Sequence, residues 1–250
     1  MALPLEPAFT LQNVSFAYGE GLPALCNVSL DIAQGERVAI LGANGCGKSA
    51  LLRIMDALLF PSQGIFRAFG ETITEKHLQT PENAYRFRRR VGCIFQNADA
   101  QLFSPTVREE IAFAPLQMRL LPGEIEQRIL DVARLLSIEN LLDRAPFQLS
   151  GGEKRKVAIA SVLIINPDAL LLDEPTTALD PRAQQELIRL MQNLHAAGKT
   201  LVTATHDLDT LPKIADRCFV FTEAHTLACV GETSDILANK DLLRSVNLIA

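Results

Sequence analysis

The sequence has no apolar run long enough to cross a membrane. Its uninterrupted apolar stretches stop at about four residues, as in 157–160, whereas a membrane-spanning helix needs about 20. Residues 1–7 carry two prolines and an acidic residue in place of a basic, apolar leader, so secretion is not expected. The sequence predicts a globular protein that neither spans a membrane nor leaves the compartment in which it is made.

The five cysteines form no CxxC pair and lie far apart among apolar neighbours, at positions 26, 46, 93, 218 and 229. This spacing predicts neither a disulfide framework nor a metal site, and we interpret the cysteines as small core residues. The net charge of -5 excludes a general attraction to nucleic acid. Arginines at 86 and 88–90 form one basic cluster, which we interpret as a solvated or partner-facing helix end rather than a nucleic-acid patch.

The pattern of apolar segments indicates an α/β protein. With 250 residues and 48% hydrophobic content, the chain can bury one substantial core. Segments 9–16 and 25–32 read as strands of a small antiparallel lobe. Segments 37–41, 169–172, 200–205 and 218–221 read as short buried strands of a parallel sheet. Within the second group, between 37–41 and 169–172, the segment 106–165 predicts several helices, one with an apolar face at 125, 129, 132, 135 and 136. The core is therefore expected to be split around a helical insert.

A glycine-rich loop follows the predicted strand 37–41 and precedes a predicted helix over 49–59. It fits the pattern G-x-x-x-x-G-K-[ST], with the residues Gly42, Ala43, Asn44, Gly45, Cys46, Gly47, Lys48 and Ser49. In such a loop, backbone N–H groups and the helix N-terminus face phosphate oxygens. Lys48 would reach the terminal phosphates and Ser49 would ligate Mg²⁺. A chance match is disfavoured because strand, loop and helix agree, so the motif predicts nucleoside triphosphate binding.

Two carboxylates end the apolar strand at 169–172. Asp173 is placed to hold Mg²⁺ through its coordination shell, as the acid of a P-loop enzyme does. Glu174 would then point at the water that attacks the γ-phosphate, as a general base or water-polarising group. The alternative is a solvated acid at a strand end before Pro175, and the neighbouring P-loop favours the functional interpretation.

The segment Leu149-Ser150-Gly151-Gly152-Glu153 precedes another predicted helix. Ser150 and Glu153 have the spacing of a capping box, so a well-capped helix is a sufficient structural explanation. Two glycines and a serine at a helix start also expose N–H groups to an anion. Together with the P-loop, this segment resembles the signature of ABC ATPases.

That resemblance implies a dimer that holds ATP between the P-loop of one subunit and the signature of the other. It also implies roles for Tyr18 (stacking on adenine), Ala178-Leu179-Asp180 (crossing the dimer interface) and His206 (a catalytic residue that contacts the γ-phosphate). Gln96 is implied as a catalytic residue and Mg²⁺ ligand that links the nucleotide to the membrane partner. Singly, a tyrosine or histidine is weak evidence, and their order along the chain strengthens it. Ala50 stands at a nucleotide-binding position where Thr is usual, and Glu153 stands where many members carry Gln.

The resemblance implies an α/β fold: a P-loop NTPase (RecA-like) core with an N-terminal antiparallel β lobe and an inserted α-helical subdomain. We expect the β lobe and core over 1–95 and 166–230, and the glutamine loop with the helical signature subdomain over 96–165. A C-terminal helical tail is expected over 231–250.

The stretch 95–107 resembles the glutamine loop of energy-coupling factor (ECF) transporters, especially cobalt/nickel importer ATPases. This implies an ATP-hydrolysing motor at the cytoplasmic face of the cell membrane, with a transmembrane T component, a separate substrate-capture subunit and a second ATPase subunit as partners. An identical or a related second subunit is possible. An ECF vitamin importer ATPase is an alternative, as is, more remotely, a non-transport ABC ATPase. No long coiled coil and no second motif set support the latter.

Overall fold

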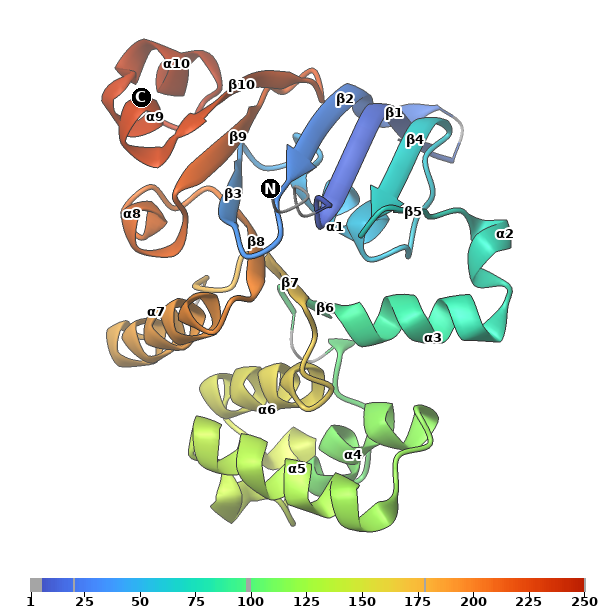
Figure 1. The fold of residues 1–250 in the computed structure, drawn as a ribbon. Coiled ribbons are helices and arrows are strands. Elements are labelled where there is room, and N and C mark those ends of the chain that lie inside the picture. The colour runs from blue at the N-terminus through green and yellow to red at the C-terminus, as the bar shows by residue number, and fades with distance from the viewer. Residues whose placement is uncertain (1–5, 20, 98–99, 178, 250) are drawn as a thin grey trace, which may run out of the picture.

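The computed structural model describes residues 6–19, 21–97, 100–177 and 179–249 (Figure 1). It contains a four-stranded sheet, a six-stranded sheet and a group of helices inserted between two strands of the larger sheet. None of the helices in these ranges is long and apolar enough to cross a membrane. The α/β fold expected from the sequence is confirmed.

The smaller sheet is the antiparallel lobe. It has the order β2-β1-β4-β5, formed by β1 (Phe9–Tyr18), β2 (Leu22–Ile32), β4 (Gln63–Ala68) and β5 (Glu71–Thr72). Phe9 on β1 stacks on Phe66 of β4, and both rings are buried. The first two strands were predicted but run longer than expected. β4 and β5 were not predicted, because β4 is short and contains Gly64, and β5 has only two residues.

The larger sheet has the order β10-β9-β3-β8-β7-β6. Five strands are parallel, namely β3 (Arg37–Leu41), β6 (Val91–Ile94), β7 (Ala169–Asp173), β8 (Thr200–Thr205) and β9 (Arg217–Phe221), and β10 (Leu227–Glu232) adds an antiparallel edge. Nearly every residue of the parallel strands is buried, which explains their continuous apolar runs. Their carboxyl ends meet at one edge of the sheet, where the predicted site residues lie.

Helix α1 (Lys48–Met55) packs between the two sheets. Leu51 and Ile54 belong to the same apolar cluster as Phe9 of the small sheet and Val38 of β3. The helix ends earlier than the predicted 59. Helices α7 (Pro181–Ala196) and α8 (Leu211–Ile214) lie on the other face of the large sheet. Along the chain, α7 precedes β8 and α8 precedes β9.

The inserted helices lie between β6 and β7, below the sheets in Figure 1. They are α4 (Val107–Gln117), α5 (Pro122–Leu136), α6 (Gly151–Leu163) and two short 3-10 turns, η2 (Glu139–Leu141) and η3 (Pro146–Gln148). The apolar face expected on α5 is confirmed for positions 125, 129, 132 and 136. Leu135 is a correction, because its side chain is 56% exposed. At about 100° per residue, Leu135 lies roughly 100° from the middle of the buried face formed by Ile125, Ile129, Val132, Ala133 and Leu136, on the opposite side of that face from Ala133, so its side chain extends past the edge of the core.

The remaining helices flank the sheets. They are α2 (Glu75–Leu78), α3 (Pro81–Arg90), α9 (Thr233–Ala238) and α10 (Lys240–Ser245). The arginine cluster is the end of α3, as expected. The Nε atom of Arg90 lies 2.7 Å from the Asp168 carboxylate, and its guanidinium carbon lies 3.6 Å from the centre of the Phe69 ring.

All five cysteines are free thiols; those at 46, 93 and 218 are buried, whereas those at 26 and 229 are partly exposed.

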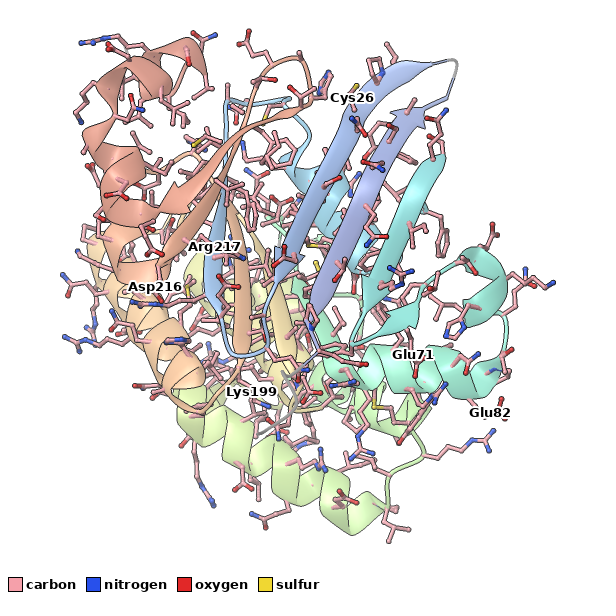
Figure 2. All side chains as sticks on the ribbon, turned by 45° about the horizontal axis from the view of Figure 1, so that its top comes forward. Cys26, Glu71, Glu82, Lys199, Asp216 and Arg217 are labelled. Atoms are coloured by element: carbon pink, nitrogen blue, oxygen red, sulfur yellow. The ribbon has the colours of Figure 1, made fainter. Side chains whose placement is uncertain are left out.

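Ion pairs join the strands at the edge of the large sheet opposite the site. Figure 2 shows Asp216 and Arg217 at the start of β9. Arg37, the first residue of β3, donates two hydrogen bonds to the Asp216 carboxylate at 2.7 and 2.6 Å. Arg217 donates to Glu36 at 3.1 Å. These contacts fix the start of β3, the strand that leads into the glycine-rich loop.

Asp56, at the end of α1, gives the fold a pH dependence. Arg88 donates to its backbone oxygen at 2.5 Å and to its carboxylate at 3.2 Å. Burial raises the pKa of Asp56 to about 7, and the charge of Arg88 offsets this only in part. An unfolded aspartate has a pKa of about 3.9, so between these values the folded state binds more protons than the unfolded state.

Ionisation of Asp56 should therefore lower the free energy of unfolding as the pH rises from about 4 to about 7, by up to about 1.4 kcal/mol per pH unit. In Asp56→Asn this contribution is absent, so the stability difference between variant and wild type should change with pH. Urea unfolding of both proteins at several pH values measures it. A constant difference would show that Asp56 does not titrate in this range.

Candidate functional site

The glycine-rich loop joins β3 to α1 in a conformation that its glycines make possible. Gly47, the residue before α1, has φ of +109°, and a Cβ there would lie 2.2 Å from the backbone oxygen of Ala24. A Cβ on Gly42 would lie 2.4 Å from the sulfur of Cys46. The loop is therefore closely packed on its inner side and would not accept side chains at these two positions.

Lys48 points back into this loop. Its side chain is buried, and its Nζ donates to the backbone oxygens of Gly42 at 2.7 Å and Ala43 at 3.2 Å. The same Nζ lies 3.8 Å from Oε1 of Glu174. The buried ammonium group is thus held among oxygen atoms, which is the environment that phosphate oxygens would also provide.

The other loop residues differ in what they can offer a ligand. Asn44 and Gly45 are exposed, and Ser49 is half-buried. The side chains of Cys46 and Ala50 are buried, and Cys46 belongs to the core cluster between the two sheets. Burial raises the pKa of the Cys46 thiol. Only the backbone groups of these two residues can face a nucleotide.

Asp173, the last residue of β7, lies beside Ser49. Burial raises the pKa of its carboxyl, and a hydrogen bond with the Ser49 side chain opposes this effect. Its Oδ1 is buried and has no hydrogen-bond partner among the described residues. A buried carboxylate oxygen without a partner is costly. Together with the serine hydroxyl it fits the oxygen ligands that Mg²⁺ prefers.

Glu174 is held by contacts from three directions. Its Oε1 lies 2.8 Å from Nδ1 of His206, and its Oε2 accepts hydrogen bonds from Thr205 at 3.3 Å and Thr177 at 3.4 Å. Its backbone has φ of +45°, a left-handed conformation that is uncommon outside glycine. The buried carboxylate is thereby fixed at the end of β7, next to Lys48 and the half-exposed His206.

The structure brings five of the predicted residues together: Lys48, Ser49, Asp173, Glu174 and His206. Gln96 follows β6, the neighbour of β7, and is exposed; its side chain forms no hydrogen bond within the described part of the chain. Tyr18, at the end of β1, packs edge-to-face on Phe16, and its hydroxyl accepts a hydrogen bond from Arg53 at 3.3 Å.

Asp180 caps α7. Its Oδ1 accepts hydrogen bonds from the backbone N–H groups of Arg182 at 2.9 Å and Ala183 at 3.0 Å. This structural role accounts for an aspartate at that position without any contact to a partner. Ala178, which belongs to the same predicted interface loop, lies outside the described residues.

The segment Ser150-Gly151-Gly152 forms the start of α6, and the predicted capping box is confirmed. The Glu153 carboxylate accepts hydrogen bonds from the backbone N–H and the hydroxyl of Ser150, both at 2.8 Å, and these bonds lower the pKa of Glu153. A Cβ added at Gly151 or Gly152 would meet nothing within 4 Å. This helix start is therefore open to an approaching group.

In Figure 1, α6 lies with the inserted helices, whereas α1 lies between the sheets. The signature segment at the start of α6 and the glycine-rich loop before α1 thus lie in different regions of the folded chain.

Three residues of the site were not predicted. Thr177 and Thr205 donate to the Glu174 carboxylate, and Arg155 of α6 donates to the backbone oxygens of Phe95 and Glu174. The position of Thr205, directly before His206 at a strand end, could have indicated a role. An arginine in the polar start of a helix carries no such signal, because it reads as a solvated residue.

A glycine-rich loop of the pattern G-x-x-x-x-G-K-[ST] with a buried lysine, together with two carboxylates at the carboxyl edge of a parallel sheet, is typical of the class of P-loop nucleoside triphosphatases. Within that class, residues 25–177 match the family model described as ABC transporter. The chain belongs to the ABC transporter family, as an ATP-binding and ATP-hydrolysing subunit of the energy-coupling factor type.

The similarity to individual relatives extends over most of both sequences. The chain is 46% identical over 248 residues to a nickel import ATP-binding protein, NikO, of Rhodobacter capsulatus, covering 98% of this chain and 97% of the relative. It is similar to the structure of CbiO1 from Clostridium perfringens, part of the transporter complex CbiONQ, with a TM-score of 0.82, 34% identity and coverage of 97% and 95%.

A second solved structure is a dimeric ATP-binding cassette in a post-hydrolysis state, bound to ADP and Pi. Its TM-score is 0.81 and its identity is 29%, and the match covers 90% of this chain and 98% of the other. The family model matches residues 25–177, and the similarity to these relatives covers nearly the whole chain.

Proposed function

We propose that this chain drives the import of nickel or cobalt ions, as the motor subunit of an importer whose membrane subunits carry the ion. The observation that supports the ion is the 46% identity, over nearly the full length, to a nickel import ATP-binding protein. The geometry that supports the motor role is the carboxylate of Glu174, fixed between Lys48 and His206.

In the proposed cycle, the loop 42–49 binds the phosphates of ATP through its N–H groups, and Lys48 transfers its hydrogen bonds from the loop carbonyls to the γ-phosphate. Tyr18 stacks on adenine. Ser49, Asp173 and Gln96 would hold Mg²⁺, which when bound neutralises charge on the β- and γ-phosphates. The oxygen atom of Asp173 that lacks a partner among the described residues supports this assignment.

Hydrolysis then depends on Glu174 and His206. Once Lys48 binds phosphate, the Glu174 carboxylate is free to accept a proton from the attacking water. The water oxygen forms a bond to the γ-phosphorus, the bond to the ADP oxygen breaks, and inorganic phosphate leaves. His206, 2.8 Å from Oε1, holds the carboxylate and faces the γ-phosphate from the exposed side.

A second ATPase subunit completes the site. Ser150 and Gly152 of one subunit would donate to the γ-phosphate bound by the loop of the other, and Asp180 with its neighbours would cross the interface. The open surface at Gly151 and Gly152 supports this arrangement, since nothing in the described chain fills it. The complete motif set permits two identical subunits, and a related second subunit is the alternative.

An exposed apolar surface after Gln96 supports docking to a membrane subunit. Phe103 and Phe113 pack edge-to-face with ring centres 4.9 Å apart, and they are 67% and 43% exposed. The buried Glu110 fixes the loop by accepting hydrogen bonds from the backbone of Phe103 at 2.8 Å and Ser104 at 2.7 Å. Exposed apolar side chains that lie together, unlike singly scattered ones, can mark an interaction site. We assign this surface to the transmembrane T component, and with that partner the chain would work at the cytoplasmic face of the membrane.

Co-purification from membranes and ion uptake test the proposal together. A tagged chain should bring down a small integral membrane protein, and cells should accumulate nickel or cobalt in a manner that depends on ATP hydrolysis. Phe103→Asp should abolish both, whereas Ile65→Asp, an exposed apolar position on β4, should abolish neither. Uptake of a vitamin in place of the ions would contradict the proposed substrate, and recovery of ribosomes or DNA would contradict the transport role.

A further inference from the structure

Arg155 is a cation buried at an unfavourable place. It lies in the second turn of α6, and its side chain is only 5% exposed. A positive charge near a helix N-terminus opposes the helix dipole, and burial removes its hydration. Burial lowers the pKa of Arg155, and the charge of Asp173 opposes this effect. Specific contacts must offset these costs.

Those contacts are two backbone oxygens on neighbouring strands. Nη1 donates to the oxygen of Phe95 at 2.6 Å, and Nη2 donates to the oxygen of Glu174 at 3.2 Å. β6 and β7 pair directly, with Ile94 opposite Leu172. The guanidinium therefore bridges the ends of both strands, at the residue before Gln96 and at Glu174 itself.

The contact to Glu174 acts on a backbone that is already constrained. Glu174 adopts φ of +45° while its N–H donates to Ala204 on β8 at 2.9 Å. The backbone oxygen of Glu174 accepts hydrogen bonds from the Arg155 side chain and from the backbone N–H of Thr177, each at 3.2 Å. An uncommon backbone conformation persists only where its surroundings hold it. Arg155 is one of the groups that hold the direction of the Glu174 side chain.

We propose that Arg155 is a positioning residue that links the two ATP sites of the dimer; this inference rests on the dimer of the proposed function. In that dimer, Ser150 and Gly152 complete the partner's ATP site, whereas Gln96 and Glu174 act on ATP bound by their own chain. Arg155 lies on the helix that carries Ser150 and Gly152, and it contacts the backbone beside Gln96 and Glu174. A displacement of α6 by ATP in one site therefore repositions the hydrolytic groups of the other.

Arg155→Lys tests this link, because lysine keeps the charge but cannot donate to two carbonyls with a fixed fork. The hydrogen bonds of the Arg155 side chain within the described residues go to Phe95 and Glu174 rather than to the glycine-rich loop, so the ATP affinity of dilute monomer should stay within about twofold of wild type. The value of kcat should fall about 10- to 100-fold through misplacement of Glu174. The Hill coefficient for ATP hydrolysis should fall towards one. Lys156→Gln is the matched control: it breaks the 2.9 Å ion pair between α6 and Glu186 of α7 and should keep both kcat and the Hill coefficient.

Should Arg155→Lys fail to fold, Arg155→Gln removes the buried charge and the fork together, and the same changes are expected. A wild-type Hill coefficient retained in the Arg155 variant that folds would overturn the link between sites, even if kcat fell. Wild-type protein that stays monomeric with ATP would instead overturn the proposed dimer, so the two failures are distinguishable.

Discussion

Replacing Glu174 with glutamine is expected to slow ATP hydrolysis about 100- to 10,000-fold, the contribution typical of a positioned proton acceptor. The amide has the shape of the carboxylate and can still contact His206 and Thr205, so the site should stay assembled. It cannot take a proton from the attacking water. Steady-state release of phosphate measures the loss, and ATP bound after gel filtration should increase because the nucleotide is no longer consumed.

The matched control for this prediction is Glu71→Gln, which changes a surface carboxylate of β5 that pairs with Arg86. That variant should hydrolyse ATP at the wild-type rate. Normal turnover by Glu174→Gln would contradict the role of Glu174 as proton acceptor and would leave His206 as the candidate for that role.

Removing the ammonium group in Lys48→Ala should weaken ATP binding itself. Charged hydrogen bonds contribute about 1.5–3 kcal/mol each, so affinity should fall about 10- to 150-fold. The substitution also removes the cation 3.8 Å from the Glu174 carboxylate, which leaves a buried acid with less compensation and lowers stability in the absence of nucleotide. Equilibrium binding of ATP measures the first effect and thermal unfolding measures the second.

Lys199 provides the comparison, since its Nζ donates to the backbone oxygen of Asn166 at 3.2 Å on the surface, away from the glycine-rich loop. Lys199→Ala should bind ATP as wild type does. An unchanged ATP affinity in Lys48→Ala would contradict the assignment of residues 42–49 as the phosphate-binding loop.

The parts of the fold that could be predicted are those encoded by local patterns. The parallel strands are continuous apolar runs because both of their faces are buried, and the strand at 200–205 was predicted to the residue. The glycine-rich loop and the capping box at Ser150 depend on neighbouring residues in the sequence, so their motifs were sufficient. Strand β6 was not predicted, because four residues with a central glycine carry too little periodicity.

The contacts that complete the site could not be read from the sequence. Arg155 reaches Glu174 across 19 positions, and Thr205 reaches it across 31, so only the folded chain brings these groups together. The exposure of Leu135 depends on where the core meets α5, which an apolar count cannot decide. The predicted roles of Tyr18, Gln96 and Asp180 follow from family resemblance. In the described part of one chain, Tyr18 and Asp180 have contacts that are structural, and the Gln96 side chain has no hydrogen bond.

The central claim is that ATP joins two copies of this fold, each lending its signature helix to the loop of the other. The most direct test is the solution mass of Glu174→Gln by analytical ultracentrifugation with saturating ATP and, separately, with ADP. We expect a dimer with ATP and monomers with ADP, and monomers with either nucleotide when Ser150→Arg fills the open helix start. A single protomer under saturating ATP, with the nucleotide bound, would contradict the account.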